Sequence, residues 1–466
     1  MNKRFILASV SLASLVITSC ASLIEPVPDT SLIAAKTADI PAEWQISNAP
    51  IRAEGFAALY DDPSLSNYLT LASEGNFDLE QARLRVSRAE AQLDFSRSRS
   101  RLSLNSSLGA SASEFLGSID SLSEAMNLGL SASYNPDLFG QLKNDVESAQ
   151  ARLGIARADE RRLRRVILSS VISAYVNAVE GQLQLSVAEQ NLEFLKETER
   201  VTHARFDAGD IAGSDLALSE LEFQSAHANV AEQRFAVADA RRALSILIGG
   251  FGDSKLSNLP TLARQLPNVS SGVPGLTVSP SDAVLSRYDV QAARLGVVDA
   301  AAQLQAIRAD DLPSTSITSA LSGGRPITDL FDIDTYIASI AAALSYNILD
   351  GGANDALQID AQAALDTQLS LYAETLRVAL RDMDGSVNQA EALAQSLNAL
   401  QAAETAAERA LKLESIRFDL GESILLDVLT VQRRVDGIRS ARLRTQRRYL
   451  EAIARAHLAL GPGPGE

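Results

Sequence analysis

The chain has 466 residues, of which 46% are hydrophobic and 21% are charged. This is the composition of a folded protein and excludes a largely disordered one. The formal net charge is −16, and because phosphate binding requires clustered lysine and arginine, this charge argues against a nucleic-acid partner.

The first twenty residues carry the pattern of a secretory leader. Residues 1–19 contain two basic residues, an apolar run too short for a good membrane-spanning helix, and the sequence ITSC, which ends at Cys20. This stretch resembles the bacterial lipobox, in which the cysteine is lipidated. We therefore expect a signal peptide over 1–19, a lipid on Cys20 as the only covalent addition, no other cofactor, and a lipid-anchored arm over 20–62. The alternative is an ordinary secretory signal in which the cysteine occurs by chance. If Cys20 is lipidated, the residue that follows it, Ala21 in place of Asp, indicates sorting to the Gram-negative outer membrane.

The rest of the chain repeats itself at a spacing of 212 residues. RFDAGDIAGSDL over 205–216 returns as RFDLGESILLDV over 417–428, and Ser-Tyr-Asn at 133–135 returns at 345–347. Several anchors at one spacing indicate an internal duplication. The predicted division is a repeat over 63–250, a proline- and glycine-rich linker over 251–280, a second repeat over 281–461 and a tail over 462–466.

Each half is predicted to contain a helix and then two strands. Sequences such as RLSLNSSLGASAS alternate apolar with small or polar residues, as β-strands do. The predicted strands lie near 101–113, 126–135, 313–322 and 336–346. Their length and mildly apolar face match tilted transmembrane strands. Four strands cannot close a barrel, and open edges are not tolerated in lipid, so we expect three copies to supply twelve strands.

Long helices are predicted after each strand pair. No proline occurs over 137–259 or 327–461, and proline is what breaks a helix interior. The predicted helices lie near 138–208, 214–248, 352–420 and 423–460. About seventy helical residues would span ~105 Å. From these blocks alone, a cytosolic coiled coil is the alternative.

A basic run, RRLRR over 161–165, lies inside the first long helix beside Asp159 and Glu160. A solvated or ion-paired helix face is the favoured interpretation of such a run, and a functional patch is the alternative.

Four motifs together resemble the TolC/OprM/NodT family of outer-membrane factors, in its acylated branch. They are YDDPSLSNYLTLASEGNFDLEQARLRVSRAEAQL at 60–93, NPDLFGQLKN at 135–144, SYNILDGG at 345–352 and the repeated RF-x-x-G phrase. The resemblance implies an α+β membrane protein with two tandem structural repeats. It implies a homotrimer with a twelve-stranded β-barrel, four strands per chain, embedded in outer-membrane lipid and continuous with a long periplasmic α-barrel.

The same resemblance implies a passive exit duct for drugs or other solutes. Its partners would be a periplasmic adaptor, of the membrane fusion protein class, and an inner-membrane pump of the RND type. A type I protein-secretion channel is the alternative within the family. A non-conducting periplasmic coiled-coil lipoprotein is the alternative from another class.

The repeated phrase is the predicted functional site, at the periplasmic tips of two helical hairpins. Its candidate residues for adaptor docking and gating are Arg205, Phe206, Gly209, Asp215, Arg417, Phe418, Gly421 and Asp427. Gly209 and Gly421 suit helix C-caps with positive φ, and the aspartates suit the first turn of the next helix. Ser214 and Ser423 are candidates for the N-caps, although they do not align at the 212-residue spacing and so do not both fit the repeat. The two arginines are expected in ion pairs. Capping alone is the simpler interpretation.

In a trimer, each aspartate would occur three times near a narrow aperture and attract cations. Relatives often carry a second acid where this chain has Thr430, so a double acidic ring is not expected. No enzyme is predicted, because His203, His227 and His457 lack partners at catalytic or metal-ligand spacing.

Overall fold

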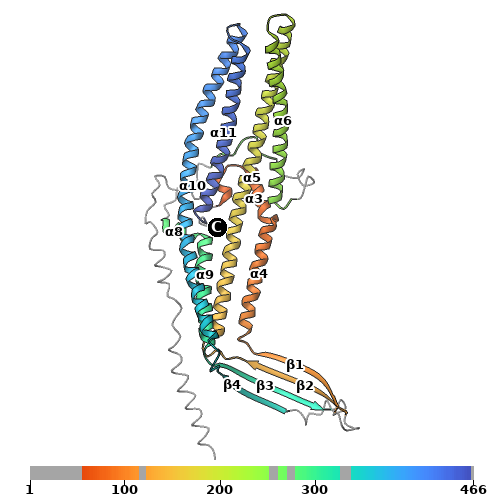
Figure 1. The fold of residues 1–466 in the computed structure, drawn as a ribbon, viewed down its shortest axis with the longest axis vertical. Helices are drawn as coiled ribbons and strands as arrows, with labels where there is room; N and C mark the ends of the chain where they lie inside the picture. The colour runs from red at the N-terminus through yellow and green to blue at the C-terminus, as the bar shows by residue number, and fades with distance from the viewer. Residues whose placement is uncertain (1–54, 115–121, 251–260, 270–278, 326–336, 463–466) are drawn as a thin grey trace, which may run out of the picture. The chain divides into compact units, whose positions relative to one another are not determined.

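The computed structural model describes residues 55–114, 122–250, 261–269, 279–325 and 337–462. Cys20, the signal peptide, most of the arm and much of the linker lie outside these described residues. The elements in chain order are η1 (Phe56–Leu59), α3 (Pro63–Gly75), α4 (Phe77–Ser98), β1 (Ser103–Glu114), β2 (Leu122–Tyr134), α5 (Gln141–Asp207), α6 (Gly213–Leu247), α8 (Pro280–Ser286), α9 (Tyr288–Asp310), β3 (Ser314–Arg325), β4 (Ile337–Ser345), α10 (Ala353–Asp419) and α11 (Leu425–Ala459) (Figure 1).

The helices of the two halves match in length. Helices α5 and α10 each have 67 residues, and α6 and α11 each have 35. The chain divides into two compact units, and the long helices contribute to both. The first unit holds residues 84–158 and 291–374, and the second holds 39–83, 159–290 and 375–466.

The first unit contains one antiparallel sheet with the strand order β1-β2-β3-β4 (Figure 1). Two of its strands are longer than the sequence pattern predicted, because β2 begins at Leu122 and β3 continues to Arg325. The added residues are mostly polar or glycine and show no apolar alternation, yet their backbones pair; Ser113 lies opposite Ser123, for example. Among the described residues, β1 and β4 each pair with a strand on one side only, which leaves two open edges.

The strand register separates apolar from polar side chains. One face collects Leu104, Leu108, Leu128, Leu130, Tyr134, Ile317, Leu321, Ile340 and Leu344. The opposite face carries mainly serine, asparagine and threonine, with Ile337 at the start of β4 as an exception. The apolar face is uncovered within one chain, since Leu108 is 66% exposed and Ile340 is 79% exposed. A sheet of this kind requires an apolar environment on one side.

An aspartate positions the start of each long helix. The carboxylate of Asp137 accepts the backbone N–H of Lys143 at 2.8 Å. The carboxylate of Asp350 accepts the N–H groups of Gly352 and Asn354, both at 2.8 Å. These backbone hydrogen bonds hold the pKa of Asp350 below its usual value. The aspartates of the DLFG and DGG motifs therefore satisfy N–H groups that the first helical turn leaves open.

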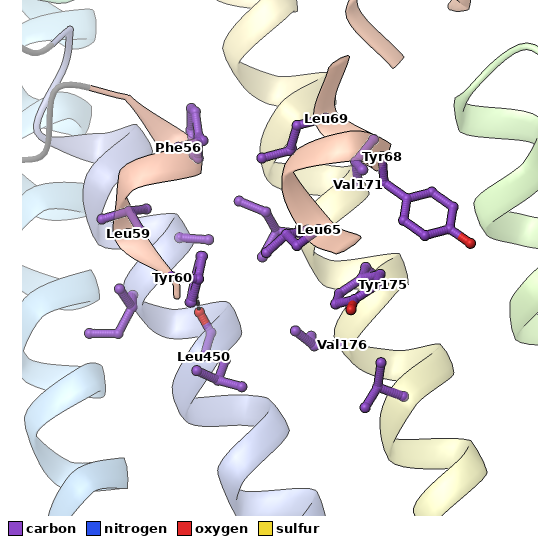
Figure 2. Close-up of a cluster of buried hydrophobic side chains, with 14 of the residues drawn as sticks. Phe56, Leu59, Tyr60, Leu65, Tyr68, Leu69, Val171, Tyr175, Val176 and Leu450 are labelled. Atoms are coloured by element: carbon purple, nitrogen blue, oxygen red, sulfur yellow. Dashed lines mark hydrogen bonds between the residues drawn. The ribbon is translucent and has the colours of Figure 1, made fainter. Parts of the chain in front are cut away.

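The main core lies in the second unit, where η1 and α3 pack against α5 and α11 (Figure 2). Phe56 and Leu59 are 2% and 0% exposed, so the end of the expected N-terminal arm belongs to this core. The hydroxyl of Tyr60 donates to the carbonyl oxygen of Leu450 at 2.7 Å. That of Tyr175 donates to Asp62 at 2.7 Å, and Asp62 also caps α3. The hydroxyls of Tyr60 and Tyr175 thus both have partners, as their burial requires.

Among the described residues, α5 alone is long and apolar enough to cross a membrane, judged by length and composition. Half of its apolar window is buried inside the protein. Several of its apolar residues, including Val171 and Ile172, are fully buried in the main core. Packing against that core therefore accounts for the apolar stretch.

Candidate functional site at the hairpin tips

The first tip is the turn over 208–212, which joins α5 to α6. The N–H of Gly209 donates to the carbonyl oxygen of Phe206, and the N–H of Asp210 donates to that of Arg205, both at 2.9 Å. Gly209 has a φ of 81°. This pair of bonds with a left-handed residue is the Schellman motif, which ends a helix by satisfying its last carbonyls.

The second tip, between α10 and α11, repeats these bonds. The N–H of Gly421 donates to Phe418 at 3.0 Å, and the N–H of Glu422 donates to Arg417 at 2.8 Å. Gly421 has a φ of 77°. The expected glycine C-caps are therefore confirmed. The arginine and phenylalanine of the repeated phrase supply the accepting carbonyls. The spacing of these two residues from the glycine is therefore the one that the hydrogen bonds of the helix end require.

The expected serine N-caps are wrong. The N-cap residues are Ala212 for α6 and Ile424 for α11, and neither makes a side-chain cap bond. Ser214 lies inside α6, and the Ser423 hydroxyl bonds instead to the carboxylate of Glu414. Sequence preference for serine did not decide the helix start, because the turn length set by the glycine motif fixes where each helix can begin.

Asp215 and Asp427 occupy the same position, in the first turn of α6 and of α11. With no side-chain cap on either helix, the aspartates supply the negative charge that stabilises exposed N–H groups there. This placement is as expected. Asp427 is exposed and Asp215 is partly exposed, so both carboxylates are also accessible to ions.

The two arginines have different contacts. Arg417 pairs with Glu414 at 3.1 Å in its own helix and donates to the carbonyl of Glu422 at 3.3 Å. Arg205 reaches the other tip, where its guanidinium carbon lies 5.0 Å from the ring centroid of Phe418. This cation–π contact links the hairpins across the tip, and no sequence motif predicts it.

An apolar cluster joins the two hairpins next to the tips. It consists of Leu195, Ala226, Leu425 and Leu429, with Phe418 and other partly buried residues packed against it. Phe206, the counterpart of Phe418, is instead 41% exposed. The repeated phenylalanines therefore differ in use: one holds the hairpins together, and the other faces outward.

A glycine pair tests the importance of the tip conformation. Gly421→Ala is expected to destabilise the fold by about 1–2 kcal/mol, because an alanine at positive φ is strained. Nothing lies within 4 Å of the new methyl group, so the cost is conformational. Gly437→Ala, inside α11 and equally open, is the control; it should stabilise by about 0.5–1 kcal/mol. Thermal unfolding midpoints that shift in the same direction would contradict this account.

Within the described ranges, no group of three or more histidine, cysteine, aspartate or glutamate side chains could hold a metal ion. The tips present charged and aromatic side chains, among them Arg205, Arg417 and Phe206, on two helical hairpins.

The family model for outer membrane efflux proteins matches the chain in two segments, residues 68–250 and 279–462. These segments cover well over half of the sequence. The chain belongs to the outer membrane efflux protein family. The resemblance to outer-membrane factors drawn from its motifs is therefore confirmed, and its location is the outer membrane.

Relatives of this outer membrane efflux protein span most of its length. Nodulation protein T of Rhizobium leguminosarum bv. trifolii is 24% identical, covering 90% of this chain and 89% of that protein. The pyoverdine export outer membrane protein OpmQ of Pseudomonas putida is 26% identical, covering 97% and 96%. Among solved structures, the Campylobacter jejuni CmeC outer membrane channel matches with a TM-score of 0.83 at 20% identity over 90% of each chain. The fold is therefore that of outer membrane efflux channels.

Proposed function

We propose that this chain forms the exit duct of a tripartite efflux system. Three copies would build a channel that passively conducts drugs or other solutes from a periplasmic adaptor and an inner-membrane transporter to the exterior. The duct would be a twelve-stranded β-barrel continuous with a periplasmic α-barrel, built from two tandem repeats. A lipid on Cys20 would anchor each copy to the outer membrane.

The sheet carries this proposal. Its register gives one apolar and one polar face, as lipid-facing and lumen-facing residues alternate in membrane barrels. Strands β1 and β4 leave open edges that lipid does not tolerate. Pairing of β1 with β4 of the next copy satisfies both edges, and three copies of four strands give an even number of strands within the usual range of about 8 to 26.

The names of relatives support efflux over protein secretion as the role of the duct. OpmQ is named for pyoverdine export, and CusC of Escherichia coli, 26% identical over 74% of this chain, is named for cation efflux. Both names describe export of small solutes. We extend to this chain only that class of cargo.

Ion conductance across a planar bilayer tests the proposal. Purified protein is expected to give discrete channel steps and to run as a heat-labile trimer on denaturing gels. A non-conducting scaffold lipoprotein would give no steps. If no conductance appears even after the tips are removed by deleting 205–216 and 417–428, the duct is excluded.

In the same bilayers, Asp427→Ala is expected to lower the cation-over-anion permeability ratio by about twofold or more, because three exposed carboxylates at a narrow mouth concentrate cations. Glu232→Ala removes the same charge from an exposed position inside α6 and is the control. Reversal potentials under a salt gradient report the ratio. Identical potentials for wild type and Asp427→Ala would leave this aspartate a helix-capping role only.

A further inference from the structure

The two halves of the chain repeat with the same register in the structure. Helix α10 begins and ends 212 residues after α5, and α11 begins and ends 212 residues after α6. Close contacts follow the same rule. Gly249 lies against Gly75, and the counterparts of these two residues, Gly461 and Arg287, lie against each other. A contact in one half therefore predicts a contact at the equivalent positions of the other half.

Contacts between the two halves can be shifted in the same way, because the chain contains only two repeats. A residue of the first half moves to the second half, and its partner in the second half moves back to the first. In a ring of copies, the shifted pair joins the second half of one copy to the first half of the next.

In the first unit, α5 of the first half meets α9 of the second half through polar side chains. The carboxylate of Asp299 on α9 accepts the hydroxyl of Ser148 at 2.6 Å and pairs with Arg152 at 3.1 Å, both on α5. Ile307 of α9 and Asp145 of α5 line one cavity together with these two α5 residues. The junction between the halves of one chain is therefore ionic here.

In the second unit, α11 of the second half meets the first hairpin through polar side chains as well. Arg447 of α11 lies 3.9 Å from the carboxylate of Glu180 on α5, and Glu180 is only 8% exposed. The side-chain amide of Gln184 on α5 donates to the carbonyl oxygen of Ser440 on α11 at 3.1 Å. The junction within one chain is therefore polar in this unit too.

At the 212-residue spacing, the ion pairs of these junctions have no counterpart in the sequence. The pairs Arg152–Asp299, Arg447–Glu180 and Arg433–Glu222, the last at 3.9 Å, shift to Ala364–Ser87, Phe235–Ala392 and Leu221–Arg434. Two of the shifted pairs carry no charge, and the third keeps one arginine opposite a leucine. The shifted junction is therefore much less charged than the junction within the chain.

Large apolar side chains occupy shifted positions and are exposed in a single chain. The counterparts of Ile307 and Asp145 are Phe95 of α4 and Leu357 of α10, which are 61% and 53% exposed. Phe235 of α6, the counterpart of an arginine, is 67% exposed. Exposed apolar side chains at positions that the repeat pairs with each other indicate a contact with another protein surface.

We propose that the next copy of this chain covers these side chains. In the first unit, Phe95 packs against Leu357 of the next copy. In the second unit, Phe235 packs against Ala392 of the next copy, an exposed residue of α10. The inference rests on the proposed trimer, and it adds that the junctions between copies are apolar at positions where the junctions within a copy are ionic.

The sheet indicates the same direction of contact. Within the chain, Leu130 of β2 lies opposite Leu321 of β3. The shifted pair is Ala342 of β4 and Gly109 of β1, so β4 of one copy would pair with β1 of the next. The helix contacts also join the second half of one copy to the first half of the next. All of these contacts run head to tail, as the closure of a ring requires.

Crosslinking tests the contact in the second unit. Gln184 and Ser440, which form a hydrogen bond within the chain, shift to Ser396 of α10 and Ala228 of α6, and both of these are exposed. Ala228→Cys/Ser396→Cys, treated with bismaleimidoethane, is expected to give covalent trimers that persist after boiling in denaturant. His227→Cys/Ser396→Cys is the matched control and should remain monomeric, because His227 is exposed beside Ala228 but turned about 100° around the helix.

Wild type, in which Cys20 is the only cysteine, and Ala228→Cys alone should also remain monomeric. A covalent product of Ala228→Cys alone would show that α6 meets α6 of another copy, and it would overturn the proposal. Equal crosslinking of the two double variants, or none in either, would overturn it as well. Wild-type conductance separates this inference from the proposed function: conducting trimers without the crosslink exclude only this contact, whereas the absence of trimer and conductance excludes both.

A charge-pair exchange tests the chemistry of the junction. Phe235→Arg should lower the temperature at which the trimer dissociates on gels, because the arginine would face an apolar surface. Adding Ala392→Glu rebuilds the pair that Arg447 and Glu180 form within the chain. The double variant should therefore recover most of the loss in low salt and lose it again in high salt. Arg234→Ala, at the exposed neighbouring position, should behave as wild type does. An unchanged dissociation temperature in Phe235→Arg, or no recovery in the double variant, would contradict the proposal.

Discussion

Replacing Leu321 with arginine is expected to abolish assembly of the channel in the outer membrane. Leu321 in β3 lies opposite Leu130 in β2 and Ala338 in β4, within the apolar face of the sheet. An arginine facing lipid near the bilayer midplane costs about 2–4 kcal/mol. In the proposed trimer, three arginines would share one belt, so the penalty would be incurred three times in each barrel.

The adjacent residue supplies the matched control. Ala320 lies opposite Ser131 and Ser339, on the polar face. Ala320→Arg adds the same side chain to the same strand, one position away, but turns it toward the proposed lumen. Outer-membrane fractionation and the amount of heat-labile trimer measure assembly. Equal trimer yields for the two variants would show that the apolar face does not contact lipid.

The sheet shows which parts of the fold could be predicted from the sequence. Alternating residues located all four strands, since the period of two is a property of the strand itself. The strand ends were less well located at 122–125 and 323–325, because backbone pairing continues where the side chains no longer alternate. Alternation alone does not predict which strands are neighbours in the sheet. The pairing of Leu130 with Leu321 therefore comes from the tertiary structure.

The hairpin tips show a second limit of prediction from the sequence. The repeated glycine located both helix ends, because positive φ strongly favours glycine. The helix starts were mislocated at Ser214 and Ser423, since serine is only one of several residues that precede a helix. The contact of Arg205 with Phe418 joins segments more than two hundred residues apart. A local motif cannot predict a contact of that kind, nor the different burial of Phe206 and Phe418.

Asp62→Ala is expected to destabilise the second unit by about 2–4 kcal/mol, because it removes a helix cap and a buried hydrogen bond together. Its Oδ1 accepts the N–H groups of Ser64 at 2.8 Å and Leu65 at 3.2 Å, which caps α3. Its Oδ2 accepts the hydroxyl of Tyr175 at 2.7 Å. Burial, followed by the hydrogen bond and charge of Asp62, raises the pKa of Tyr175, so the hydroxyl remains a donor at physiological pH.

Tyr175→Phe separates the two roles of Asp62. This variant keeps the helix cap and loses the hydrogen bond to Asp62 together with the longer one that the hydroxyl accepts from the Ala263 N–H at 3.4 Å, so it should cost about 1–2 kcal/mol. The double variant Asp62→Ala/Tyr175→Phe should lose less unfolding free energy than the two single variants lose together. Removing Asp62 alone leaves the buried Tyr175 hydroxyl without its acceptor, whereas the double variant has no hydroxyl to satisfy. Asp61→Ala, at the exposed neighbouring position, controls for charge. Denaturant midpoints followed by helical circular dichroism measure these costs, and strictly additive values would show that Asp62 acts on α3 alone.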